Sequence, residues 1–214
     1  MKRKIPCLCD NSFEIEAPEE IDLDSNKEYL EQILDGSFFN FNCPSCNKKH
    51  KPEFPLRLLW PSRNLNLEIL PELDRGEFYR KKKQSKDTVS AAETIIGYPE
   101  MVDRLTVIRD GLEPISVEAI KYYLQLKAEE QYPEDEMDVW YYGFEEKGAS
   151  GGENTLEFHI HGIRQNEVAV MKVPYALYQK TLDDYKNNPK KDIFVALRVG
   201  TYLSVKNTMN QGVF

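Results

Sequence analysis

The four cysteines of the chain all lie in its first quarter, as two tight pairs. Cys7 and Cys9 form Cys-Leu-Cys, and Cys43 and Cys46 form Cys-Pro-Ser-Cys. Two such pairs are typical of a tetrahedral zinc site with four thiolate ligands, which the fold must bring together and which closes the segment between them into a loop. We therefore expect one structural zinc ion, held by all four thiolates and left with no open coordination position.

Three alternatives to this site remain open. His50, four residues after Cys46, is placed to replace one thiolate. Cys-Pro-Ser-Cys is also compatible with a redox dithiol or a disulfide, but the next segment, NKKHKPEFP, predicts no helix of the kind that activates a thioredoxin-like thiol. The first pair has one intervening residue where zinc ribbons usually have two, so a metal-free site is the third alternative.

Composition excludes some classes of protein. The chain has 214 residues, 41% of them hydrophobic, and a net charge of −8, which argues against a generic binder of polyanions. No apolar run is long enough to span a bilayer, and no apolar region comes after the basic residues Lys2, Arg3 and Lys4. We expect a cytoplasmic protein without membrane contact, where a reducing environment favours metal ligation over structural disulfides.

The N-terminal third predicts a β-rich module with one inserted helix. The segment DSNKEYLEQILDG has Asp24 or Ser25 as a helix cap, Ile33 on its apolar stripe and Gly36 as its end. Short strands are expected at FEIE, FFNFN, FPLRLLW and LNLEIL, the last two joined by the turn PSRN.

These segments together resemble one known family. The cysteine pairs, FEIE, the helix segment, FFNFNCPSC and KPEFPLRLLW are similar to the CpXC family, a group of mostly bacterial and archaeal proteins of unknown function named for two Cys-Pro-x-Cys motifs. Cys43, Pro44 and Cys46 match the second motif, whereas in the first Pro6 precedes Cys7 and one residue is missing before Cys9. The resemblance covers about residues 5 to 75 and more loosely extends to Gln131. It implies a zinc-ribbon-like module and no particular activity.

A basic segment, Arg80 to Asp87, is the clearest break in composition. It is either a small patch for anions or nucleic acid or a solvated linker, and the absence of interleaved aromatic residues favours the linker. The predicted organisation is a zinc-ribbon-like module at 1–78, a basic linker at 79–90 and an α+β domain at 91–214.

The C-terminal domain is expected to begin with a helix pair within 99–131, followed by a β-rich region at 137–214 with an antiparallel sheet. Met101, Leu105 and Ile108 line one face of the first helix, and Ile120, Tyr123, Leu124 and Lys127 recur at helical spacing in the second. The segments DVWYYGFEE, NTLEFHIHGI and EVAVMKV predict strands, PYALYQKTLDDYKNN predicts a helix, and DIFVALRV with YLSVKN predicts a final hairpin around Gly200. The fold class is α+β.

One further cluster of titratable residues lies in this domain. Glu157, His159 and His161 alternate along a strand, so their side chains share one face and are placed to bind a metal with a third ligand such as Asp138 or Glu145. The simpler interpretation, which we favour, is a solvent-facing sheet surface. No nucleophilic triad or phosphate-binding loop is recognisable, so we expect no catalytic residue.

These patterns predict a zinc-binding protein that acts as a protein-interaction or scaffold module with an unknown protein partner. The alternative is a nucleic-acid-binding regulator that uses the zinc ribbon, and an enzyme with a site in the C-terminal domain is a third hypothesis.

Overall fold

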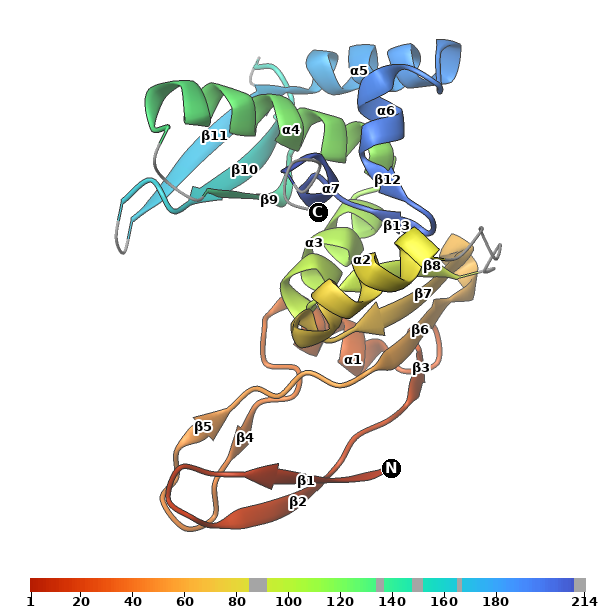
Figure 1. Ribbon diagram of the computed structural model, residues 1–214. Coiled ribbons are helices and arrows are strands. Elements are labelled where there is room, and N and C mark those ends of the chain that lie inside the picture. The colour runs from red at the N-terminus through yellow and green to blue at the C-terminus, as the bar shows by residue number, and fades with distance from the viewer. Residues whose placement is uncertain (85–91, 134–136, 148–151, 165–166, 210–214) are drawn as a thin grey trace. The chain divides into compact units, whose positions relative to one another are not determined.

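The structure, a computed structural model, describes residues 1–84, 92–133, 137–147, 152–164 and 167–209. It is a mixed α+β fold with several sheets (Figure 1). The chain divides into two compact units, Met1–Val102 and Asp103–Phe214.

Two small hairpins form the N-terminal part of the first unit. Strand β1 (Lys2–Pro6) pairs antiparallel with β2 (Ser12–Glu16), and β4 (Phe41–Asn42) pairs antiparallel with β5 (Lys49–His50). The hairpins lie side by side, and the turn of each carries one cysteine pair (Figure 1). The strand predicted at FEIE is confirmed, whereas β1, which begins with three basic residues, was not predicted.

The strand predicted at FFNFN is only two residues long, because the preceding phenylalanines belong to an aromatic cluster. Phe38 and Phe39 stack with their ring centroids 4.1 Å apart, and Phe39 has a positive φ of 53° that no strand allows. Phe39 also meets the rings of Phe54 and Tyr98. The Tyr98 hydroxyl donates to the carbonyl of Phe54 at 3.2 Å and accepts from the N–H of Phe54 at 3.1 Å. The cluster therefore connects three parts of the sequence, around Phe39, Phe54 and Tyr98.

A sheet with the strand order β8-β7-β6-β3 forms the centre of the first unit. Strand β6 (Leu56–Trp60) pairs antiparallel with β7 (Leu65–Leu70) across the 3-10 turn η1 (Pro61–Arg63), as the sequence predicts. Strand β3 (Glu20–Asp22) pairs in parallel with β6, and β8 (Glu93–Ile96) pairs in parallel with β7. Both are too short for alternation to identify them.

Helix α1 (Lys27–Leu34) confirms the predicted helix but not its predicted cap. The N-cap is Asn26, and no side chain caps the helix. The carboxylate of Asp24 instead accepts the N–H of Ser62 at 2.7 Å and its hydroxyl at 2.6 Å, which joins the loop before α1 to the turn after β6. Ile33 is fully buried, and Gly36 ends the helix with a φ of 77°.

Part of the predicted basic linker is helical. After the 3-10 turn η2 (Glu72–Asp74), helix α2 (Arg75–Gln84) takes in the first residues of the linker and buries Phe78 and Tyr79. Residues 85–91 lie outside the described residues, so the boundary at 79–90 stays a prediction. Strand β8, which comes after this segment, pairs with β7 and therefore belongs to the first unit.

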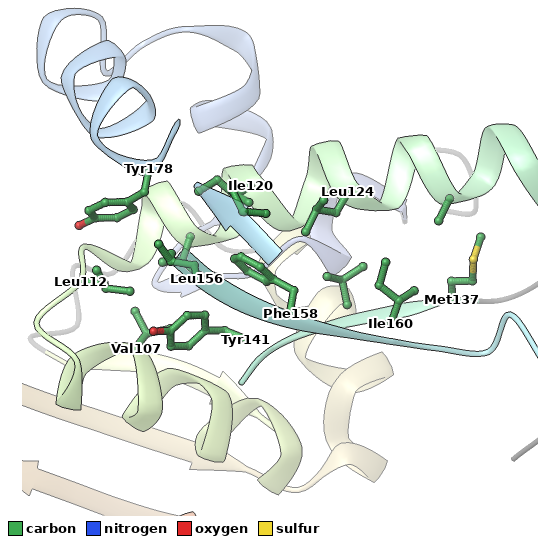
Figure 2. Packing of buried hydrophobic residues seen from close by; sticks show 14 residues of the cluster. Val107, Leu112, Ile120, Leu124, Met137, Tyr141, Leu156, Phe158, Ile160 and Tyr178 are labelled. Carbon is green, nitrogen blue, oxygen red and sulfur yellow. The ribbon is translucent and has the colours of Figure 1, made fainter. Parts of the chain in front are cut away.

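The second unit has a three-stranded antiparallel sheet with one helix packed across it. Strands β9 (Asp138–Glu145), β10 (Thr155–His161) and β11 (Val168–Pro174) have the order β11-β10-β9 and confirm three predicted strands. Helix α3 (Tyr98–Arg109) crosses the division between the units, and α4 (Pro114–Gln131) comes after it. Leu156, Phe158 and Ile160 of β10 point toward α4 and form the core there (Figure 2).

The predicted face of α4 is only partly correct. Ile120 and Leu124 are buried, but Tyr123 and Lys127 are exposed. The N-terminal half of α4 is buried on several sides, because a second core cluster, which includes Ile115, packs against it from the C-terminal segments.

The C-terminal segments begin with helix α5 (Tyr175–Asn187), as predicted. The prediction of a strand throughout DIFVALRV is wrong: Asp192–Ala196 form helix α6, and only Arg198–Val199 (β12) pair with Tyr202–Leu203 (β13). Phe194 and Leu197 are buried whereas Val195 is 57% exposed, a spacing that a helical turn satisfies and a strand does not. The short helix α7 (Lys206–Met209) is the last element in the described residues.

Candidate metal centre

The turn of the first hairpin is closed by two backbone hydrogen bonds around its cysteines. The N–H of Cys7 donates to the carbonyl of Asn11 at 2.8 Å, and the N–H of Asp10 donates to the carbonyl of Cys7 at 3.1 Å. Asp10, directly after Cys9, has a φ of 63°. This left-handed conformation reverses the chain and is one that Asp tolerates better than most residues.

The turn of the second hairpin repeats this arrangement with one more residue. The N–H of Cys43 donates to the carbonyl of Lys48, and the N–H of Asn47 donates to the carbonyl of Cys43, both at 2.9 Å. Asn47, directly after Cys46, has a φ of 57°. In both turns the residue after the second cysteine is therefore left-handed.

The four thiols converge between the two hairpins. Their sulfur atoms all lie within 4.8 Å of one another. Two contacts cross from one hairpin to the other: Cys7 Sγ lies 3.6 Å from Cys46 Sγ, and Cys9 Sγ lies 3.6 Å from Cys43 Sγ. Cys7 and Cys43 are buried, and Cys9 and Cys46 are exposed.

These distances fit a metal site better than disulfides. A disulfide requires about 2.05 Å between the sulfur atoms, and all four cysteines are free. Four thiolates at about 2.3 Å from a tetrahedral ion stand about 3.8 Å apart, close to the 3.6 Å of both cross-hairpin pairs. The four cysteines are thus close enough together to hold a metal ion.

The turns give their first cysteines different electrostatic environments. The N–H of Cys46 and, against the effect of burial, the N–H of Ser45 lower the pKa of Cys43 to about 6. At Cys7 the N–H of Cys9 lowers the pKa, but burial and hydrogen bonds to the other thiols outweigh it and raise the pKa to about 12. Of these two thiols, Cys43 therefore carries negative charge more readily, and the longer turn supplies the extra donor.

His50 lies beside the cluster and not within it. Its Nε2 is 3.2 Å from Cys7 Sγ, a distance suited to an N–H···S hydrogen bond, and its ring contacts Phe13 edge-on at 5.7 Å. Among the described residues, the group of converging ligand atoms contains the four cysteines and does not include His50. The hypothesis that His50 replaces a thiolate therefore gains no support, and its position is that of an outer hydrogen-bond donor.

The second candidate cluster, on β10, does not form such a group in the described part of the chain. Glu157 and His159 share a face of the sheet opposite to Phe158, and His159 Nε2 lies 2.9 Å from Glu157 Oε1. The ring of His159 stacks on Tyr142 with 4.0 Å between centroids, and His161 is exposed.

The two acidic residues considered as a third ligand are engaged elsewhere. Asp138 lies 3.5 Å from the ammonium group of Lys206, and Glu145 accepts from Lys172 at 2.6 Å. These contacts favour the interpretation of this face as an ordinary sheet surface.

A buried network of charged residues in the second unit was not predicted. The ammonium group of Lys121 donates to Asp103 and, at 2.8 Å, to Glu118. Asp103 also accepts the N–H of Tyr141 on β9 at 2.6 Å, and Glu118 accepts the N–H of Val205 at 2.7 Å. The network thus joins α3, α4, β9 and the segment after β13.

Burial and charge act against each other in this network. Burial raises the pKa of Asp103 to about 6, although Lys121 opposes the shift. Burial also acts to raise the pKa of Glu118, but Lys121 and Arg104 outweigh it, so this pKa is lowered. The only sequence signal was the position of Glu118 and Lys121, three residues apart beside the apolar stripe of a helix.

No described helix combines the length and the apolar character that a bilayer crossing requires.

Two hairpins with converging thiols, followed by a mixed sheet and a helix pair, place the chain among proteins built around a cysteine cluster. The chain belongs to the CpXC family: the family model described as "CpXC protein" matches residues 5–121, more than half of the sequence. This confirms the predicted resemblance, and the match ends within α4.

One relative is similar over nearly the whole chain. It is an uncharacterized protein of Treponema pallidum (strain Nichols), 28% identical over 217 residues, which cover 95% of this chain and 97% of the relative. No solved structure matches the chain.

Proposed function

We propose that the four cysteines bind one structural zinc ion and that the two hairpins form a zinc ribbon. The observation that carries this proposal is the convergence of four free thiols at the spacing of tetrahedral thiolate ligands. An all-thiolate donor set selects soft or borderline ions such as zinc. The ion would supply a cross-link between the two hairpins, so that metal binding stabilises the fold.

A closed four-thiolate site leaves no position for a substrate or a catalytic water. The role that fits best is therefore a protein-interaction or scaffold module in a reducing cytoplasm, where the thiols stay available to the metal. The side chain of Leu8, between the two cysteines of the first turn, is 84% exposed. An apolar side chain held at the tip of a metal-braced turn is suited to insertion into a partner protein.

The charges of the first hairpin favour a protein partner over nucleic acid. On its exposed face Lys2 of β1 stands opposite Glu16 of β2 and Lys4 stands opposite Glu14, so each positive charge has a negative charge across the strand pair. Phosphate binding needs a continuous positive surface, which this face does not offer.

The experiment compares Leu8→Ser with Leu73→Ser, a control at a leucine that is 97% exposed in the same unit. Both variants should retain zinc. Proteins captured from the native host should be lost with Leu8→Ser and kept with Leu73→Ser. Equal capture by both variants, or tight binding of DNA or RNA that weakens steeply with salt, would reject the interaction role.

A further inference from the structure

Strand β11 is the outer strand of the sheet in the second unit, and no described strand pairs with its free edge. Six of its seven residues are exposed. Its apolar side chains Val168, Val170 and Met171 are 44%, 56% and 40% exposed. Natural proteins rarely leave an apolar edge strand uncovered, because its unpaired backbone groups recruit other strands.

The opposite edge of the same sheet, formed by β9, is less open to a further strand. Within β9, the N–H of Tyr141 donates to the buried carboxylate of Asp103, and the pairing with β10 is interrupted by a bulge beside Glu157. Both features stop further strand addition at that edge.

The charge that would protect β11 is neutralised within its own sheet. Lys172 is the one basic residue of the strand, and an edge lysine normally discourages pairing. Its ammonium group is 2.6 Å from Glu145 and 3.9 Å from Glu157. The edge is therefore apolar and carries no net repulsive charge.

We propose that β11 pairs antiparallel with β11 of a second copy of this chain, so that two three-stranded sheets form one continuous sheet across a twofold axis. A twofold interface needs a single self-complementary surface, which β11 supplies. This inference goes beyond the proposed zinc-ribbon function, because the strand lies outside the residues that the family model matches.

If the two β11 strands pair in a register centred on Val170, the side chains that stand opposite each other are compatible on both faces of the sheet. The exposed face of the sheet already aligns Val170 with His159, Lys172 with Glu157, and Val168 with His161. In the dimer Val170 would face Val170 of the other copy, and Lys172 would face Val168. On the other face Ala169 would meet Met171. No like charges stand opposite each other, as cross-strand pairing requires.

Sedimentation velocity of the full chain at increasing concentration tests the proposal. The wild-type mass should rise from 24.9 kDa toward twice that value. Val170→Lys places two ammonium groups opposite each other and should raise the dissociation constant at least about tenfold. Val195→Lys is the matched control, because Val195 is 57% exposed on α6, and it should dimerise like the wild type.

A mixing experiment separates a lost interface from a damaged fold. Val170→Lys and Val170→Glu should each be monomeric alone and should form a mixed dimer when combined, because opposite charges then face each other at the axis. A wild-type chain that stays monomeric at every concentration would overturn the proposal, and so would failure of the two variants to combine. Dimers of Val170→Lys as tight as those of the wild type would also overturn it.

Discussion

At the scale of single residues, the geometry of each cysteine turn depends on the residue directly after its second cysteine. Asp10 and Asn47 both occupy the left-handed region, with φ of 63° and 57°. A β-branched residue there would clash with its own backbone. The two turns therefore tolerate Asp, Asn or Gly at these positions and resist other residues.

We expect Asn47→Val to destabilise the first unit by about 1–2 kcal/mol, the cost of a left-handed conformation for a residue with a Cβ branch. Asn47→Gly should be close to neutral, because glycine adopts this conformation freely. Denaturant unfolding with zinc present measures both. Lys48→Val, at the next position in the turn, is the control, and an equal loss from Asn47→Val and Lys48→Val would reject the argument.

His50 is the second residue-scale determinant of the proposed site. Its Nε2, 3.2 Å from Cys7 Sγ, is placed to donate a hydrogen bond to Cys7, whose pKa is raised to about 12 by burial and by the other thiols. Removal of an outer-shell donor typically weakens metal binding about 10- to 100-fold.

We therefore expect His50→Gln to lose zinc to a competing chelator at a concentration about tenfold lower than the wild type does. His161→Gln makes the same change at an exposed histidine of the second unit and should leave zinc affinity unchanged. The role assigned to His50 fails if the two variants release zinc alike.

At the scale of elements, the buried network around Lys121 joins α3, α4, β9 and the segment after β13 by polar contacts beside the apolar core. It supplies partners for a β9 amide through Asp103 and for the amide of Val205 through Glu118. Both carboxylates depend on the same ammonium group.

Lys121→Met should destabilise the second unit by about 3–5 kcal/mol, because it leaves the buried carboxylate of Asp103 without its cation and that of Glu118 with Arg104 alone. The loss of stability relative to the wild type should be largest near neutral pH and should shrink in acid. Without Lys121 both carboxylates protonate more easily, and protonation removes the uncompensated charge. Unfolding at several pH values measures this. Lys127→Met, on an exposed turn of the same helix, should cost little at any pH, and a pH-independent deficit at Lys121 would contradict the explanation.

The predictability of each element depends on the strength of its local pattern. Strands β9 and β10 and helix α5 were predicted because their side chains alternate or recur against one core, and β11 was predicted from its valine-rich run, although six of its seven residues are exposed. Helix α6 was mistaken for a strand, because a short apolar run fits both periods and only the burial of Phe194 and Leu197 decides between them. The charged network was missed because its partners come from segments far apart in sequence.

At the scale of the whole molecule, each unit contains one of the two tryptophans. Trp60 lies in the first unit, with the cysteine cluster, and Trp140 lies in the second. Fluorescence can therefore follow the unfolding of each unit separately.

We expect zinc removal to lower the unfolding midpoint that Trp60 reports, in a Trp140→Phe background, because the proposed ion stabilises only the unit that binds it. The midpoint that Trp140 reports, in a Trp60→Phe background, should change much less. Equal shifts of both signals on addition of a chelator would mean that the metal does not act through the first unit.

The candidate site was predictable because the type and spacing of its residues along the chain indicate metal ligands. Two cysteine pairs in a chain without other cysteines predicted the convergence, but the sequence did not indicate that His50 lies outside the cluster. It also did not indicate which face of α4 is buried, since that depends on packing against the C-terminal segments.

The metal content of the purified protein tests the central claim most directly. Elemental analysis should find one zinc ion per chain, and Cys43→Ser, which removes a buried ligand, should lose the metal and unfold more readily. Val195→Ser, at an exposed position far from any cysteine in the sequence, should keep it. A fully folded wild-type protein that contains no metal and has four thiols open to titration would contradict the account.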